Sequence, residues 1–280
     1  MFDLAKIKTA ESPGPNKEVN GRYNILLNKD FGFFSHPLIV ANLWYYLKIM
    51  EKPKKFAAFD IDGTIFRSSL LIELTEALID EGLFPPEARV EYRASFEKWL
   101  NREDEYGKYI EDIITVFNKN IKGISYGDFI GVVKKLMSEK KNRTYVYTRE
   151  LVRNLKKRGY YLIAISGSPK GILDIFCQEL GFDKIYGRFY ELGPGDKFTG
   201  AIVDEHLIAN KANIIHRVVE KENLTLEGSI AVGDTSADIP MLEAVEKPIC
   251  FNPNEKLYRY AKLNKWPVIV ERKDVIYRIN

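Results

Sequence analysis

The sequence predicts an α/β fold with a helical bundle inserted near its start, and two patterns carry this prediction. After residue 142, short and nearly continuous apolar segments alternate with helical segments, which is typical of a parallel sheet buried on both faces. Between residues 68 and 141 the pattern is helical, and no strand is predicted there. The 280 residues suffice for a core domain that carries such an insertion.

Residues 1–52 are predicted to form an N-terminal arm followed by a helix. The arm, to about residue 35, is rich in Pro, Gly, Asn and Lys, and the helix covers Pro37–Met50. This apolar helix is shorter than the roughly 20 residues that a membrane span needs, and it contains Asn42 and Lys48. We therefore expect a packed amphipathic helix, with attachment to a membrane surface as the less favoured alternative.

Four helices are predicted in the insertion. Ser68 or Ser69 can cap the first, and the apolar residues from Leu70 to Ile79 are spaced for one helical face. The other three are predicted over Glu87–Leu100, Tyr106–Asn120 and Tyr126–Lys140. Because four consecutive helices can form a compact bundle, we expect residues 67–141 to stand apart from a core made of 53–66 and 142–280.

The core is predicted to alternate strands and helices. Its strands are expected at Phe56–Phe59, Tyr160–Ile165, Ser229–Val232, Pro248–Phe251 and Pro267–Val270, with short strands and a turn within Lys184–Val203. Its helices are expected at Thr148–Arg158, Pro169–Leu180 and Ala209–Asn223.

The composition is that of an ordinary globular protein and narrows the choice of partners. The net charge of +3 gives no reason to propose nucleic acid as a partner. Cys177 and Cys250 lie among apolar neighbours and are expected to be buried free thiols, which fits a reducing, cytoplasmic location. No secretory signal is recognised at the start of the sequence.

The most informative segment is Asp60-Ile61-Asp62-Gly63-Thr64, which directly follows the first predicted strand. Alternation along a strand would point the two aspartates to opposite faces, so the chain must bend at once if they are to converge, and Gly63 permits that bend. Two carboxylates brought together need a cation or a shared proton, and Mg²⁺ prefers oxygen ligands. A simple turn or helix cap is the alternative interpretation.

Polar residues also follow two other predicted strands: Ser166-Gly167-Ser168 and the run from Gly233 to Asp238. Carboxyl ends of parallel strands share one edge of a sheet, where ligands bind. Lys211, near the start of a helix, could reach the same edge, and Lys197 and Lys221 are the alternatives. Asp238 could instead cap the helix that follows it.

Together, these four segments resemble the motifs of the haloacid dehalogenase superfamily, in the order found there. The helical insertion after the first motif is similar to the cap of its phosphoserine-phosphatase-like branch. The resemblance implies a Rossmann-like three-layer sandwich with a helical cap. It also implies a Mg²⁺-dependent phosphatase that acts on a small phosphomonoester through an aspartyl-phosphate.

The resemblance also implies a role for each matching residue. Asp60 would be the nucleophile, Asp62 the acid and base, and Lys211 the cation that neutralises the phosphoryl group. The implied phosphate-binding residues are Gly63, Thr64, Ser166, Gly167 and Lys211. The implied metal ligands are Asp60, Asp62 (through its carbonyl) and Asp234, with Asp238 supporting them from behind or through water.

Two positions depart from the branch. Ser69 stands where phosphoserine phosphatases carry a glutamate that holds the substrate amine, and Ala237 stands where they usually carry asparagine. We therefore expect a substrate other than phosphoserine. A phosphotransferase with the same site is the first alternative, and a non-catalytic, membrane-associated scaffold that docks through the first 52 residues is the second.

Overall fold

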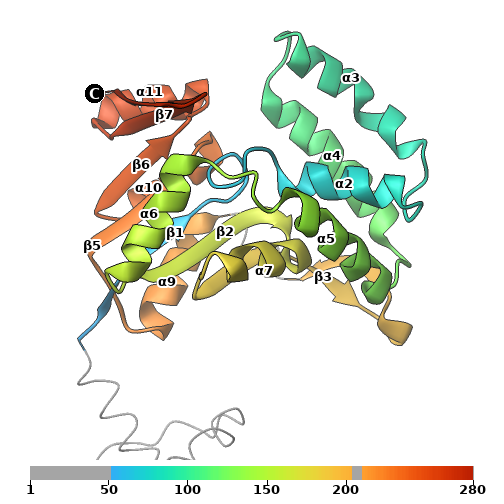
Figure 1. The fold of residues 1–280 in the computed structure, drawn as a ribbon, viewed down its shortest axis with the longest axis horizontal. Coiled ribbons are helices and arrows are strands. Elements are labelled where there is room, and N and C mark those ends of the chain that lie inside the picture. Colours follow the sequence, from blue (N-terminus) through green and yellow to red (C-terminus); the bar gives the residue numbers. More distant parts are fainter. Residues whose placement is uncertain (1–51, 204–209, 280) are drawn as a thin grey trace, which may run out of the picture. The chain divides into compact units, whose positions relative to one another are not determined.

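The computed structural model describes residues 52–203 and 210–279 (Figure 1). The predicted arm and the predicted helix Pro37–Met50 lie outside the described residues. Among the described helices, none has the length and apolar character needed to cross a bilayer.

A sheet of eight strands forms the centre of the described chain. In sheet order the strands are β4 (Phe198–Val203), β3 (Lys184–Leu192), β2 (Tyr161–Pro169), β1 (Lys54–Phe59), β5 (Leu224–Gly233), β6 (Lys247–Phe251), β7 (Val268–Arg272) and β8 (Val275–Ile279). All neighbours pair in parallel except β3 with β4 and β7 with β8, so the predicted parallel sheet has an antiparallel pair at each edge. The strand order reverses at β1, where β2 lies on one side and β5 on the other.

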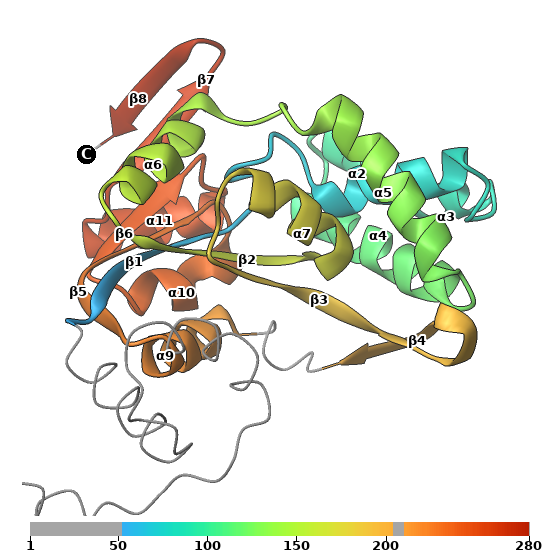
Figure 2. The same ribbon diagram turned by 60° about the horizontal axis from the view of Figure 1, so that its bottom comes forward.

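Helices cover both faces of this sheet, which gives the expected three layers (Figure 2). One layer holds α6 (Val146–Lys157) and α7 (Lys170–Glu179), and the other holds α9 (Lys211–Lys221), α10 (Ile239–Glu243) and α11 (Glu255–Asn264). The alternation along β1 explains the layers: Ala57 and Phe59 belong to the hydrophobic cluster that includes α6 and α7, whereas Phe56 and Ala58 belong to that of α9 to α11.

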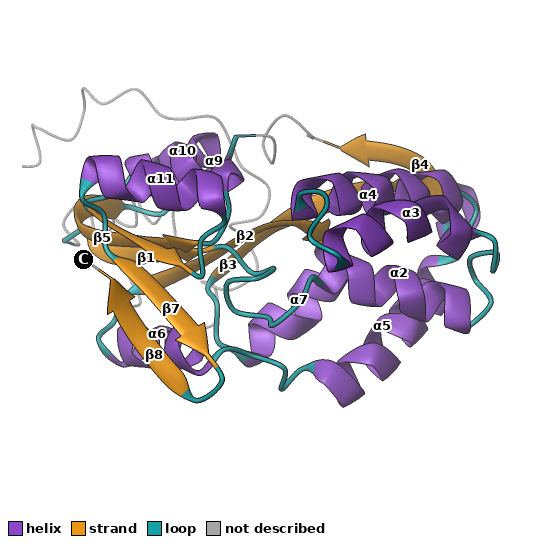
Figure 3. Cartoon of the chain, turned by 90° about the horizontal axis from the view of Figure 1, so that it is seen from above, coloured by secondary structure: helices purple, strands orange, loops and turns teal. Residues whose placement is uncertain are grey.

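The helical insertion comprises α2 (Leu70–Asp80), α3 (Ala88–Leu100), α4 (Tyr106–Ile121) and α5 (Tyr126–Lys140), close to the predicted bounds. These helices gather at the β3 and β4 side of the sheet (Figure 3). Phe117 meets Phe84 edge to face at 5.6 Å, and Phe129 meets Phe198 of β4 at 5.2 Å. The insertion is therefore packed against the sheet edge through a continuous apolar core.

Two described elements were not expected from the sequence. Helix α11 buries only Leu257 and Ala261 fully, and strand β8 exposes Val275, Ile276 and Tyr277. Both are short, ten residues for α11 and five for β8, so each shows only a few repeats of the pattern on which such predictions depend. Strand β5 also begins earlier than expected, at Leu224.

Candidate active site

The chain bends sharply where it leaves β1. Gly63 adopts a φ of +81° and donates its N–H to the carbonyls of Phe66 and Ser68, each at 3.0 Å. A Cβ atom at Gly63 would lie 2.2 Å from Oδ2 of Asp234, so only glycine fits at this approach. The bend lets the carboxylates of Asp60 and Asp62 both line one pocket, as the sequence predicts.

Lys211 forms a buried ion-pair network with two carboxylates. Its Nζ lies 2.5 Å from Oδ1 of Asp60 and 2.6 Å from Oδ1 of Asp238, and all three side chains are nearly inaccessible to solvent. Lys211 begins α9, where the side chain of Asn210 caps the helix by accepting the Ala212 N–H at 3.0 Å. Burial alone would lower the pKa of Lys211, but the charges of Asp238 and Asp60 outweigh it and raise that pKa.

Asp238 both supports the site and caps a helical turn, the two roles considered for it from the sequence. While Oδ1 faces Lys211, Oδ2 accepts the N–H groups of Asp234 at 3.1 Å and Thr235 at 3.0 Å, which caps the short 3₁₀ turn η4 (Ser236–Asp238). It makes no side-chain cap to α10, the helix for which a cap was considered. Gly233 makes room for it, because a Cβ there would lie 2.5 Å from the Asp238 Cβ.

Three carboxylates, those of Asp60, Asp234 and Asp238, offer oxygen atoms within 4.8 Å of one another. The Asp62 carboxylate is not part of this group, and the expected role of Asp62 as a ligand through its carbonyl stays a prediction. Burial, partly offset by Lys211, raises the pKa of Asp60 to about 7, and burial raises that of Asp234 well above its ordinary value.

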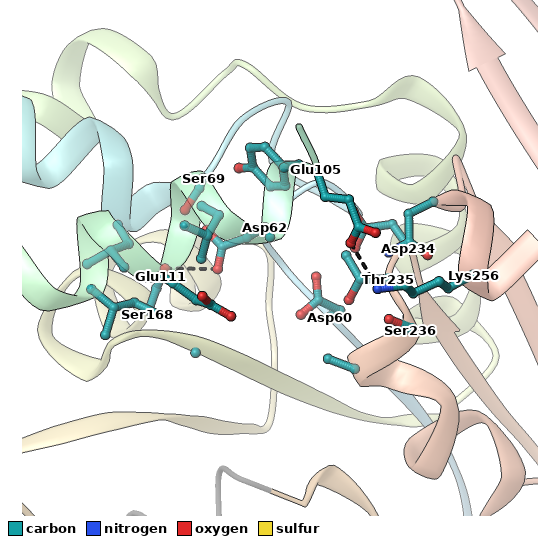
Figure 4. A pocket seen from close by; sticks show the side chains of 18 of the residues that line it. Asp60, Asp62, Ser69, Glu105, Glu111, Ser168, Asp234, Thr235, Ser236 and Lys256 are labelled. Carbon is teal, nitrogen blue, oxygen red and sulfur yellow. Dashed lines mark hydrogen bonds and ion pairs between the residues drawn. The ribbon is translucent and has the colours of Figure 1, made fainter. Parts of the chain in front are cut away.

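The Asp62 carboxylate points away from these three carboxylates and accepts hydrogen bonds from three donors. It accepts the Ser168 hydroxyl at 2.8 Å (Figure 4), the Leu70 N–H at 2.5 Å and the Ser166 hydroxyl. Asp62 takes the amide at the start of α2, and Ser69, the residue before that helix, makes no side-chain cap. Ser166 directs its hydroxyl at Asp62, and its expected contact with phosphate stays a prediction.

Thr64 also orients a carboxylate, and its expected contact with phosphate stays a prediction. Its hydroxyl donates to Oδ1 of Asp234 at 3.1 Å, and its carbonyl accepts the Thr148 hydroxyl at 2.8 Å. Thr64 and Ser166 are both fully buried. Thr64 and Ser166 therefore fix the acidic side chains from behind the pocket surface.

The pocket has a volume of about 860 Å³ and lies between the strand ends and α4. Of the predicted residues, Asp60, Asp62, Gly167, Lys211 and Asp234 line it. The insertion adds residues that the sequence alone did not identify, including Tyr106, Ile110 and Glu111. The helical period of α4 predicts its apolar face but not which of its turns overlies the strand ends.

An ion pair joins the insertion to the core at this pocket. Lys256 Nζ, on α11, lies 2.9 Å from Oε2 of Glu105, which precedes α4 (Figure 4). Both side chains are largely exposed, so solvent screens their attraction.

Together, the three-layer α/β fold and this cluster of buried acids at the strand ends match the haloacid dehalogenase-type site that the sequence resembles. A family model described as haloacid dehalogenase-like hydrolase matches residues 57–243, which is more than half of the chain. The chain belongs to this family.

Phosphoserine phosphatases are among its relatives. One from Archaeoglobus fulgidus is 28% identical over 208 residues, covering 74% of this chain but only 55% of that protein. Another, from Methanocaldococcus jannaschii, is 26% identical over 228 residues, covering 81% of this chain and 96% of that protein.

A solved structure of a phospho-aspartyl intermediate analogue of phosphoserine phosphatase aligns with a TM-score of 0.55 at 23% identity, covering 80% of this chain and 96% of that one. At this identity the likeness shows the fold. With these findings, the expected membership of the phosphoserine-phosphatase-like branch is confirmed, and the chain is a phosphatase-type enzyme.

Proposed function

We propose that this protein is a Mg²⁺-dependent phosphomonoester hydrolase in which Asp60 is the nucleophile. The observation that carries the proposal is the buried Asp60 carboxylate, which opens on the pocket while Lys211 holds one of its oxygens at 2.5 Å. A fixed carboxylate beside a buried cation is suited to attack a phosphoryl group whose negative charge that cation offsets.

The acidic cluster fits a hard divalent cation. Among the described residues, Lys211 pairs with two of the three converging carboxylates, those of Asp60 and Asp238, so the cluster keeps an excess of negative charge in a buried place. We propose that Asp60, Asp234 and the carbonyl of Asp62 hold Mg²⁺, with Asp238 supporting Lys211 and the Asp234 loop. When bound, the ion would neutralise phosphoryl oxygens.

The protein's own groups would carry the reaction in two steps. First, an Asp60 oxygen forms a bond to phosphorus while the ester P–O bond breaks, and Asp62 gives a proton to the departing oxygen. Water then attacks the aspartyl-phosphate, Asp62 takes a proton from that water, and phosphate leaves with Asp60 restored. The three donors on Asp62 hold its carboxylate in one orientation for both transfers.

For the substrate we propose a small phosphorylated metabolite other than phosphoserine. Ser69, which lines the pocket, supplies no charge for a substrate amine, and Leu71, Ile110 and Ile114 add apolar surface nearby. We also propose that the helical cap encloses the substrate and excludes water. A cytoplasmic location is supported by the two buried free thiols, Cys177 and Cys250.

The test is the Asp60→Asn variant, assayed with p-nitrophenyl phosphate and Mg²⁺. We expect hydrolysis to be abolished with the melting temperature preserved, and the exposed Asp128→Asn variant to serve as the matched control. Acid quenching of the wild-type enzyme with radiolabelled substrate should trap label on the protein. Full activity in Asp60→Asn would refute the mechanism.

The same assay separates hydrolysis from transfer. With an added alcohol or sugar acceptor, a phosphotransferase would form a new phosphate ester, whereas the proposed hydrolase releases inorganic phosphate only. The scaffold alternative depends on residues outside the described chain, and measurable turnover would remove its non-catalytic premise.

A further inference from the structure

Arg188 occupies an unusual place beside the proposed reaction centre. It lies on β3 opposite Pro169, immediately after the Ser166–Ser168 segment that holds Asp62. Gly187 allows this approach, because a Cβ there would lie 3.0 Å from the Ser168 carbonyl oxygen and 2.3 Å from a Leu173 methyl carbon. The strand therefore brings Arg188 to the Asp62 side of the pocket.

The direction of the Arg188 side chain follows from that of Tyr190, two residues further along the same strand. Strand alternation places Arg188 and Tyr190 on the same face, and Tyr190 donates its hydroxyl to Asn118 of α4 at 2.6 Å. Ile114 and Glu111 lie one and two turns before Asn118 on that helix, and both line the pocket together with Arg188. Arg188 thus faces α4 across the space next to Asp62.

The Arg188 side chain is half-buried and has no carboxylate partner in the described part of the chain. Its Nε is buried without a hydrogen-bond acceptor, and among residues 52–203 and 210–279 no carboxylate forms an ion pair with it. Arg149 Nε is buried in the same way, but its guanidinium donates to Thr144 and Arg149 does not line the pocket. A buried, unsatisfied polar group that lines a pocket is a candidate ligand contact.

We propose that Arg188 binds a carboxylate on the leaving group of the substrate. This inference rests on the proposed function, because Asp62 then marks the leaving-group side and Arg188 is the cation next to it. A planar guanidinium matches the geometry of a carboxylate, and the pairing would offset a charge that no carboxylate of the described residues neutralises. Glu111, which lines the same pocket, would repel a doubly charged second phosphate more than a singly charged carboxylate.

The test compares two esters that differ at one carbon: 3-phosphoglycerate, which carries a carboxylate, and glycerol 3-phosphate, which carries a hydroxymethyl group instead. We expect wild-type kcat/KM to favour 3-phosphoglycerate by about tenfold or more, the usual effect of a hydrogen bond to a charged group. Arg188→Met should bring the ratio of the two kcat/KM values close to one. Arg149→Met, the matched control, should keep the wild-type ratio.

Three outcomes would overturn the inference. The first is an unchanged kcat/KM ratio in Arg188→Met. The second is an equal loss of kcat/KM on both esters, which indicates a phosphoryl-binding or structural role for Arg188. The third is a wild-type kcat/KM that is higher for a bisphosphate than for 3-phosphoglycerate. Calorimetry measures the binding of both esters to the Asp60→Asn variant with Mg²⁺, and so tests the carboxylate site independently of the proposed hydrolysis. If neither ester is hydrolysed, the proposed function fails, while an Arg188-dependent binding preference would still support the carboxylate site and equal binding would refute it.

Discussion

The close packing of Gly233 against Asp238 gives a sharp test of how the site is held together. In Gly233→Ala the new Cβ would lie 2.5 Å from the Asp238 Cβ and 2.7 Å from its carboxyl carbon. Non-bonded carbons normally approach to about 3.5–4.0 Å, so one group must move by about 1 Å. Asp238 cannot move that far without disturbing its 2.6 Å contact with Lys211 and its bonds to the Asp234 and Thr235 amides.

The expected cost follows from these contacts. Overpacking costs about 1–3 kcal/mol, and damage to a buried ion pair adds to it, so we expect Gly233→Ala to lose about 3 kcal/mol of unfolding free energy. Lys211 would shift with Asp238, and a displacement of about 1 Å can lower kcat about 100-fold.

Urea denaturation and p-nitrophenyl phosphate hydrolysis measure the two effects. Gly131→Ala is the matched control: it lies in α5, a Cβ there meets nothing within 4 Å, and it should be neutral or slightly stabilising. A loss below about 1 kcal/mol in Gly233→Ala, with normal turnover, would refute the packing argument.

Three further predictions concern the charges of the site. Lys211→Met leaves the buried carboxylates of Asp60 and Asp238 without their shared cation, so urea titration should show a loss of about 3–5 kcal/mol; an unchanged midpoint would contradict this. Ser168→Ala removes one donor from Asp62, and kcat should fall about tenfold in steady-state assays, with little change in melting temperature. In EDTA, the melting temperature should decline as the pH rises from about 4 to about 7, because the folded protein keeps a proton on Asp60 (pKa about 7) that the unfolded chain releases near the ordinary value of 3.8. Mg²⁺ should offset this decline, and a rise in stability over that range would disprove it.

The positions of the acidic residues and of Lys211 could be predicted because they follow from backbone topology. Residues at the carboxyl ends of β1, β2 and β5 must meet at one sheet edge, and Asp60, Ser166 and Asp234 do lie there. The start of α9 brings Lys211 to the same place. These relations need only the order and direction of strands and helices, which the apolar pattern indicates.

What the hydroxyl groups bind could not be predicted in the same way. Ser166 and Thr64 could direct their hydroxyls at a phosphate or at a neighbouring carboxylate, and the spacing of residues does not distinguish these orientations. Here they donate to Asp62 and Asp234. Arg188 escaped notice for a related reason, because its lack of a partner depends on every side chain around it.

The central position of β1 has a consequence for how this protein is made. Its two neighbours, β2 and β5, begin only at Tyr161 and Leu224, so the strand that leads into Asp60 acquires its pairing partners late in synthesis. Contacts between distant segments form slowly because long loops must close first. A nascent chain shorter than β5 therefore has its proposed nucleophile but not the Asp234 and Asp238 side chains around it. Until the ribosome has supplied those segments, β1 is an unpaired apolar strand that chaperones or aggregation would compete for.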